Sequence, residues 1–318
     1  MSKLNRLICA VYRKNVGYGT CPFNPDLIVT ILLFGTERVF TDAELDELEQ
    51  ILRDLAVSDS KDTRMYPVKN IVDIADNTED ETIETTGYGS KFLVRDGDYD
   101  ITFRLSGAGG VCLQNALSTF NGPTPFLLVD KQGRIIGTKK NGKLATIPPQ
   151  FFYAKNIKLP TGSTGVGYYV RISFFSKYIS KDIAFVKADF DVDDIDGLQD
   201  LKIVQNSFDS ETGELNISLL TDCGSVNVGE TYNEILSANP SLFIATNGET
   251  GVDIAVTSAT WNAGTKTFDV VLDIESGGYP EDGTGILFNL DVVSVLSAAG
   301  IDGYEATEIE LDPESSSS

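Results

Sequence analysis

Histidine is absent from the 318-residue sequence, and tryptophan occurs once, at Trp261. Because histidine is the usual general base near neutral pH and a common metal ligand, its absence excludes Ser-His-Asp and Cys-His catalysis and histidine metal centres. The 47 acidic residues offer many carboxylate pairs for glycoside hydrolysis, but a single tryptophan argues against an aromatic-lined sugar cleft. We therefore predict a protein that is not an enzyme, with no catalytic residues, no metal site and no cofactor.

Phosphate-binding motifs are also missing. The run Gly107-Ala108-Gly109-Gly110 precedes a predicted helix, as a phosphate-binding loop would. It lacks both the G-K-[ST] ending and the G-x-G-x-x-G spacing. We interpret it as a glycine turn that leads into a helix without a ligand.

Long apolar runs do not occur. No stretch approaches the roughly 20 apolar residues of a membrane-spanning helix, and the run at residues 7–12 is too short for a signal peptide. The cysteines Cys9, Cys21, Cys112 and Cys223 are far apart, without a C-x-x-C pair that would favour zinc. We expect free buried thiols in a reducing compartment, with up to two disulfides as the alternative. The chain is therefore expected to be made in the cytosol and not to bind a membrane.

Basic residues are scarce in the last third of the chain. Of the 25 Lys and Arg residues, 24 lie at or before Lys202, and only Lys266 follows. Residues 203–318 contain 20 acids and have a net charge of −19, whereas residues 1–202 have a net charge of −3. Such a sharp break is expected where two modules are joined.

We therefore predict three regions: an α+β domain at residues 1–200, an all-β immunoglobulin-like sandwich at 201–312, and a disordered tail at 313–318. The total net charge of −22 argues against nucleic acid as the main partner, because binding phosphates requires clustered Lys and Arg. It also argues against docking on an anionic membrane.

The first domain is predicted to be a β-rich sheet with two helices. The apolar run at residues 26–34 indicates a strand that is buried on both faces. Thr41 and Glu44 form a capping box at the start of the first helix. The helix carries an apolar stripe of four leucines, which we expect to pack on the sheet: Leu45, Leu48, Leu52 and Leu55.

Further elements follow in the order expected of an α+β domain. Residues 99–105 alternate as a strand with Tyr99, Ile101, Phe103 and Leu105 on one face. The other predictions are a short helix at 111–120, a hairpin around 131–133 and a strand at 165–174. The polar, acidic segment at residues 70–89 is expected to be a long loop. The Gly-Tyr-Gly triplets at 17–19 and 87–89 are interpreted as turns.

The second domain shows short strands separated by Gly, Asn, Asp and Ser. Its connections S-E-T-G, N-G-E-T-G and N-A-G-T-K are typical of hairpins and loops, and a short helical piece is expected at residues 231–238. This pattern, over about 110 residues, favours an immunoglobulin-like or related sandwich. The predicted strands are 201–208, 215–220, 242–245, 253–261, 267–273 and 285–293.

The run D-F-D-V-D-D-I-D-G-L-Q-D, residues 189–200, is the densest group of possible calcium ligands. An EF-hand loop needs acids at positions 1, 3 and 5, glycine at 6 and glutamate at 12. Counting from Asp189 places Asp194 at the glycine position and Asp200 at the glutamate position, and counting from Asp191 places Ile195 at position 5. We interpret the run as a joint between domains, with incidental calcium binding as the alternative.

Residues 25–200 resemble structural proteins of tailed phages, particularly phages that infect Bacteroidota. The resemblance is carried by L-F-G-T-E-R-V-F-T-D-A-E-L-D-E-L, T-T-G-Y-G-S-K-F-L-V-R-D-G-D-Y-D-I-T-F-R-L, F-N-G-P-T-P-F-L-L-V-D-K-Q-G-R-I-I-G-T and D-G-L-Q-D-L-K-I. It implies a self-assembling tail subunit of the tube or sheath type with an appended immunoglobulin-like domain. Its partners would be copies of itself and other virion proteins, and it would reside in the virion after assembly in the host cytoplasm. It carries no functional residue over, because the function of such proteins is assembly.

Three alternatives to a tail subunit remain at this point. A capsid decoration or head-associated protein would form a trimer or a monomer instead of a ring. A bacterial surface or secreted protein would use the sandwich as an adhesive module. A glycan-active virion enzyme would need two carboxylates beside an aromatic cleft.

Overall fold

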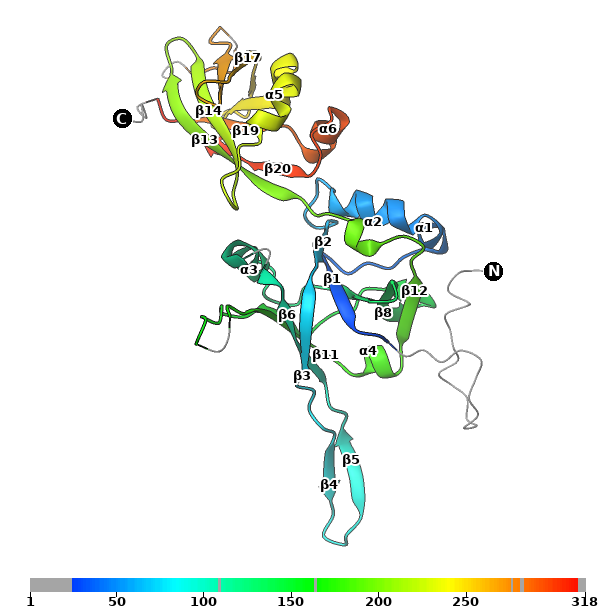
Figure 1. The fold of residues 1–318 in the computed structure, drawn as a ribbon. Coiled ribbons are helices and arrows are strands. Elements are labelled where there is room, and N and C mark those ends of the chain that lie inside the picture. Colours follow the sequence, from blue (N-terminus) through cyan, green and yellow to red (C-terminus); the bar gives the residue numbers. More distant parts are fainter. Residues whose placement is uncertain (1–24, 108–109, 163–164, 276, 281–282, 314–318) are drawn as a thin grey trace. The chain divides into compact units, whose positions relative to one another are not determined.

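The structure, a computed structural model, describes residues 25–107, 110–162, 165–275, 277–280 and 283–313. These residues fall into two compact units, divided between Gly197 and Leu198. Both units consist mostly of β-strands with few helices (Figure 1). The predictions for Cys9, Cys21, the first Gly-Tyr-Gly triplet and the tail beyond Pro313 lie outside the described residues.

The first unit contains twelve named strands and four named α-helices among its described residues. Its strands are β1 (Ile28–Phe34), β2 (Met65–Val68), β3 (Ile71–Asp76), β4 (Thr82–Thr85), β5 (Lys91–Arg95), β6 (Tyr99–Leu105), β7 (Phe126–Asp130), β8 (Arg134–Lys140), β9 (Lys143–Ala145), β10 (Phe151–Ala154), β11 (Tyr168–Phe174) and β12 (Ile183–Lys187). Its helices are α1 (Asp42–Asp46), α2 (Leu48–Ala56), α3 (Gly110–Ser118) and α4 (Lys177–Ser180), with a 3₁₀ turn at Val192–Asp194.

These strands form two main sheets and one separate ribbon. The first sheet has the order β12-β8-β7-β1-β2, with β9 added beside β8, and the second has the order β10-β11-β6-β3. Strands β4 and β5 pair with each other as a two-stranded ribbon. The segment at residues 70–89, expected to be a loop, therefore contains β3 and β4, and that prediction is wrong. Its acidic residues masked a strand signal, because Ile71, Ile74 and Ile83 are spaced too widely to stand out.

Strand β1 contributes side chains to both hydrophobic cores of the first unit. Leu32 and Phe34 pack into one core with the leucines of α1 and α2. Ile31 and Leu33 point the other way and pack into a second core with the sheet that contains β6 and β11. Because successive side chains of a strand alternate between faces, one apolar strand serves both cores. The predicted burial on both faces is confirmed.

The predicted helix is confirmed at its beginning and is interrupted within. Glu44 N–H donates to the Thr41 hydroxyl oxygen at 3.2 Å, and Thr41 N–H donates to the Glu44 carboxylate at 2.7 Å, which completes the capping box. At Glu47 the backbone leaves the helical region (φ −116°, ψ 34°). The result is two short helices, α1 and α2, in place of one. All four leucines of the stripe are buried.

The capping box should make the stability of this unit depend on pH. Partial burial acts to raise the pKa of Glu44, but the hydrogen bonds from Thr41 and the charge of Arg38 outweigh it and lower the pKa below its ordinary value of 4.5. The stabilisation is therefore present above pH 4.5 and is lost as the pH falls through the lowered pKa of the folded state. Glutamine keeps the geometry of the capping box but removes the charge near the helix N-terminus, so we expect Glu44→Gln to lower the free energy of unfolding by about 0.3–1 kcal/mol at pH 7 and by less at pH 3.

Urea unfolding followed by circular dichroism at both pH values tests this expectation. Thr41→Ser, which keeps the capping hydroxyl, is the matched control and should unfold like the parent. An equal loss for Glu44→Gln at pH 7 and pH 3 would show that the carboxylate charge does not stabilise the helix.

The hairpin predicted around residues 131–133 is also confirmed. Strands β7 and β8 are antiparallel, with Leu128 opposite Ile136. Gly133 has a φ of +72° in the connection, a conformation that glycine adopts without steric cost. The Asp130 carboxylate accepts hydrogen bonds from the backbone N–H groups of Gln132 and Arg134, each at 3.0 Å. A buried side chain thus closes the turn.

The second unit contains two sheets that share one hydrophobic core. Its strands are β13 (Gln199–Asp209), β14 (Glu214–Thr221), β15 (Phe243–Asn247), β16 (Asp253–Ile254), β17 (Val256–Asn262), β18 (Thr267–Leu272), β19 (Ile286–Leu290), β20 (Tyr304–Thr307) and β21 (Ile309–Glu310). The sheet orders are β17-β18-β14-β13-β20 and β16-β15-β19-β21. Ile217 and Phe268 from the first sheet meet Phe243 and Phe288 from the second in that core.

Two α-helices modify the predicted all-β architecture of this unit. Helix α5 (Gly229–Ala238) was expected from the sequence, whereas α6 (Val293–Ala298) was not predicted and begins at the last residue of the predicted strand 285–293. Leu236 and Leu296 bring these helices into the common core. The unit is therefore mostly β, and β20 pairs with β13 in parallel, a contact between distant segments that local pattern does not reveal.

Three connections of the second unit repeat one turn. Asp209, Asn247 and Asn262 each begin the turn, and the side-chain oxygen of each accepts hydrogen bonds from the backbone N–H groups two and three residues later. The residue four positions on has a positive φ in each case, namely Gly213, Gly251 and Lys266. The hairpin chemistry predicted for these segments is confirmed. The polar side chains that begin these three turns therefore stabilise the fold.

The expectation of free buried thiols is wrong for the cysteines that the structure describes. Cys112 and Cys223 are both disulfide-bonded. Cys112 is half-buried and Cys223 is exposed.

Candidate interaction site

The β4–β5 ribbon belongs to neither hydrophobic core of the first unit. Figure 1 shows it projecting beyond β3 and β6, the two strands that lead into and out of it. Every residue of both strands is exposed. Within the part of the chain that the structure describes, β4 and β5 pair with no third strand. The ribbon therefore reaches into solvent without a core of its own.

Apolar side chains are nevertheless concentrated on this ribbon. The exposed fractions are 52% for Ile83, 47% for Phe92, 55% for Leu93 and 54% for Val94, and Tyr88 at the tip is fully exposed. Isolated two-stranded hairpins are at best marginally stable in water, and clustered exposed apolar residues commonly mark interaction surfaces. The ribbon is thus the strongest candidate for an interaction site.

The sequence contains a signal for this ribbon. Residues 91–94 are Lys-Phe-Leu-Val, and Ile83 lies the same distance before the Gly87-Tyr88-Gly89 turn as Leu93 lies beyond it. Two short apolar strands around a glycine turn indicate a hairpin. The interpretation of the triplet as a turn is confirmed, since Gly89 has a φ of +80° and its N–H donates to the Thr86 carbonyl at 2.9 Å.

At the base of the ribbon, the segment that enters it and the segment that leaves it are in close contact. A Cβ atom at Gly97 would lie 1.7 Å from the carbonyl oxygen of Glu79, so no other residue fits without a backbone shift. Arg95 pairs with the carboxylate of Glu79 at 2.7 Å. Asn77 N–H donates to the Asp100 carbonyl at 2.7 Å. The ribbon is therefore anchored where it leaves the sheet.

We expect Gly97→Ala to loosen the ribbon while leaving the two cores of the unit intact. The added methyl group must push the two segments at the base apart at Glu79, which lowers the local stability of the ribbon by about 1–3 kcal/mol. Amide hydrogen exchange in β4 and β5 should become at least 5-fold faster. Gly87→Ala is the matched control, because a Cβ there meets nothing within 4 Å. Equal exchange in the two variants would contradict a role for Gly97 in holding the base.

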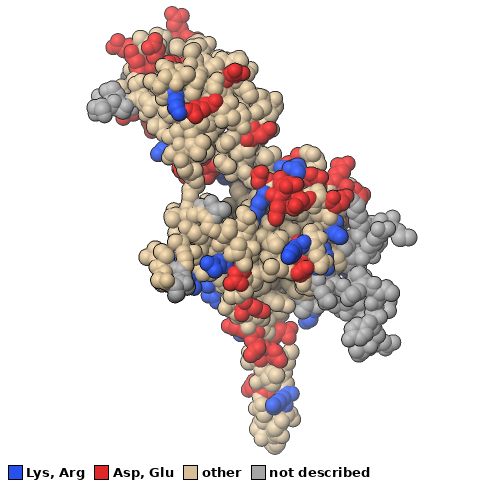
Figure 2. All heavy atoms as spheres, viewed as in Figure 1, with Lys and Arg blue, Asp and Glu red and all other residues tan. Residues whose placement is uncertain are grey.

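Charge divides the projection into two parts. The flanking residues 71–81 and 96–100 contain eight acids and no basic residue, whereas residues 82–95 contain Glu84, Lys91 and Arg95 and have a net charge of +1. Figure 2 shows Asp and Glu side chains gathered near the base of the projection, and mostly uncharged surface farther out. The outer part thus combines apolar surface with a slight positive charge.

The open face of the sheet beneath the ribbon carries a polar cluster. Arg171 donates to both carboxylate oxygens of Asp100, from Nε at 2.7 Å and also from Nη2, and this bond raises the pKa of the guanidinium group. Lys155 donates to the Thr102 hydroxyl at 3.1 Å. Burial, followed by the positive charges of Arg171 and Lys158, lowers the pKa of Lys155. These contacts join β6, β11 and the end of β10, which is a structural role.

The aspartate run is bonded within the first unit. The Thr30 hydroxyl donates to Asp193 at 2.6 Å, and Lys69 pairs with Asp196 at 2.7 Å. Asp191 accepts from the N–H of Asp193 at the start of the 3₁₀ turn. The run crosses the division between Gly197 and Leu198, and its last residues, Gln199 and Asp200, begin β13 in the second unit. These contacts give the aspartates of the run structural partners in the first unit.

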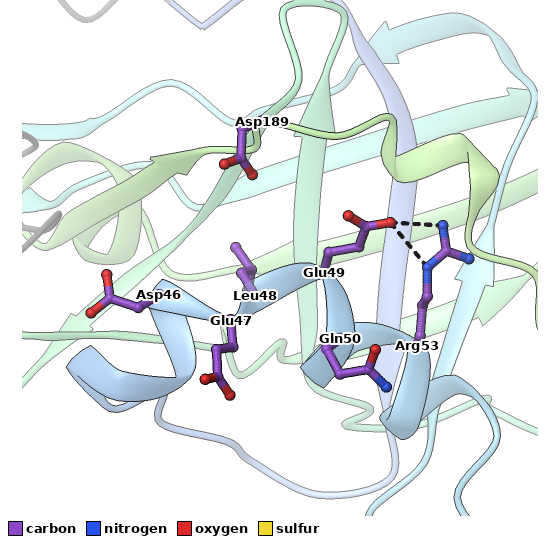
Figure 3. Close-up of a pocket in the computed structure, with 7 residues that line it drawn as sticks. All are labelled: Asp46, Glu47, Leu48, Glu49, Gln50, Arg53 and Asp189. Atoms are coloured by element: carbon purple, nitrogen blue, oxygen red, sulfur yellow. Dashed lines mark hydrogen bonds and ion pairs between the residues drawn. The ribbon is translucent and has the colours of Figure 1, made fainter.

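A surface pocket lies at the junction of α1 and α2. Figure 3 shows that its lining is mainly acidic, with Asp189 facing the start of α2 from the opposite side. The Glu49 carboxylate is paired with Arg53 at 2.9 and 3.1 Å. These seven side chains include four carboxylates but no histidine, thiol or hydroxyl group. Its lining residues are Asp46, Glu47, Leu48, Glu49, Gln50, Arg53 and Asp189.

Comparison with known proteins does not assign the chain to a family. No protein-family model matches the chain. No curated protein matches it either. Among the described residues, no helix is long and apolar enough to cross a membrane. The function must therefore be argued from the ribbon and from the surfaces around it.

Proposed function

We propose that this chain is a non-enzymatic virion structural protein of a tailed phage, a self-assembling tail subunit of the tube or sheath type. Self-association is the part of this proposal that the geometry supports. The single observation that carries it is the β4–β5 ribbon, which exposes about half of each of four apolar side chains and has no core. The phage setting is supported by the resemblance of residues 25–200 to virion proteins.

The C-terminal unit is proposed to be an appended immunoglobulin-like domain. Two sheets around one core support this assignment, as does the antiparallel pairing of β13, β14, β18 and β17. Residues 203–318 have a net charge of −19. A surface of this sign repels DNA and repels other particles, which suits a virion component.

Light scattering of the purified full-length chain, together with negative-stain images, tests the proposal. Rings or tubes of many copies are the expected result. A trimer that binds phage heads would favour the capsid decoration protein, and monomers that bind a glycan or a cell surface would favour the adhesive module. Either result would overturn the tail assignment.

A further inference from the structure

We infer that the ribbon is buried on both of its faces in the assembled state, inserted between two neighbouring copies of the chain. This inference rests on the proposed self-assembly and specifies its geometry. In the ribbon, Ile83 lies opposite Leu93, and Glu84 lies opposite Phe92. Residues that are directly opposite share a face of a ribbon, and adjacent residues alternate between faces. Ile83 and Leu93 therefore occupy one face, and Phe92 occupies the other.

Both faces carry exposed apolar side chains, the Ile83–Leu93 pair on one and Phe92, opposite Glu84, on the other. Leu93 is 55% exposed and Phe92 is 47% exposed. Val94 is the extra residue where the register shifts between Thr82 and Ile83, and it is 54% exposed. A ribbon that lay flat on one partner would leave Phe92 or the Ile83–Leu93 pair in water. Insertion between two surfaces removes both from water, which is the arrangement that the hydrophobic effect favours.

The neighbouring surface is assigned to other copies of this chain on the basis of charge. The whole chain has a net charge of −22, whereas residues 82–95 have a net charge of +1. Most of this charge lies in residues 203–318, with a net charge of −19, and eight more acids flank the ribbon in residues 71–81 and 96–100. These acidic segments repel the same segments of another copy, and the ribbon meets no such repulsion. Apolar burial supplies the favourable free energy, and the sign of the charge makes an acidic copy a suitable partner.

The experiment compares one substitution on each face in the full-length chain. Phe92→Thr and Leu93→Thr remove apolar surface and keep a residue that favours β-strands. Val252→Thr, at an exposed apolar residue outside the ribbon (47% exposed), is the matched control. Light scattering over a range of concentrations gives the concentration at which half of the chain is assembled, and circular dichroism verifies folding.

Both ribbon variants should raise the concentration for half-assembly by roughly 10-fold, and Val252→Thr should leave it unchanged. An effect of only one ribbon variant would overturn two-sided burial and leave the proposed self-assembly intact. If neither variant has an effect while the parent chain assembles, burial of the ribbon is overturned and the proposed self-assembly stands. If the parent chain is a monomer, both proposals fail. Binding of the parent to phosphatidylcholine vesicles in place of assembly would likewise overturn the assignment to neighbouring copies.

Discussion

Replacing residues 82–95 with Asn-Gly should convert the assembled protein into single chains of intact fold. The replacement removes β4, β5 and their exposed apolar side chains, and Asn-Gly is a favoured two-residue hairpin connection. The join is sterically feasible because the two segments that flank the ribbon already meet at Gly97 and Glu79. No ribbon residue belongs to either core of the first unit. The ion pair between Arg95 and Glu79 is exposed, so its loss costs less than about 1 kcal/mol.

Light scattering measures the mass of this variant, and urea unfolding measures its stability. A monomer with the stability of the parent is the expected result. Assembly at the parental concentration would place the self-association surface elsewhere. A variant that fails to fold would show that the ribbon contributes to the core, which would contradict the exposure of all its residues.

Asp130→Ala should cause the largest loss of stability. The Asp130 side chain is completely buried, and it pairs with Arg134 at 2.7 Å. It also accepts hydrogen bonds from the backbone N–H groups of Asp26, Gln132 and Arg134. Removing the carboxylate leaves a largely buried guanidinium group and three N–H groups without this acceptor. Breaking a buried ion pair on one side costs about 3–5 kcal/mol.

The two units allow an internal control for this measurement. Trp261 is the only tryptophan and lies in the second unit, so its fluorescence follows that unit. Circular dichroism reports the unfolding of both units. In Asp130→Ala, the part of the dichroism signal that belongs to the first unit should be lost at lower urea concentration, while the fluorescence transition of the second unit stays in place.

Glu37→Ala provides a matched comparison. It breaks the exposed ion pair with Lys140, in which both side chains are about half exposed, and such pairs contribute less than about 1 kcal/mol. A similar loss for Asp130→Ala and Glu37→Ala would contradict a structural role of the buried carboxylate.

Short-range patterns in the sequence determined many of the local elements. The Thr41–Glu44 capping box, the leucine stripe and the hairpin closed by Gly133 depend on residues within a few positions of each other. The same holds for the turns that begin at Asp209, Asn247 and Asn262. Propensities, caps and turn geometry act over such distances, so these elements could be predicted without knowledge of the fold.

The absence of histidine and the uneven charge were also properties of the sequence alone. They excluded histidine-dependent catalysis, and they placed the expected boundary near residue 200, beside the division between Gly197 and Leu198. Composition acts through the chemistry that is available and does not require a fold.

Only the tertiary structure decided which apolar residues stay in water. Leu93 and Leu33 both lie in apolar runs, yet Leu33 is fully buried and Leu93 is 55% exposed. Leu33 is buried because β1 lies between two layers, whereas Leu93 belongs to a ribbon that pairs with nothing else among the described residues. The parallel pairing of β13 with β20 has the same origin, since it joins segments about 100 residues apart. Burial and pairing of this kind depend on contacts between distant segments, which local sequence patterns do not encode.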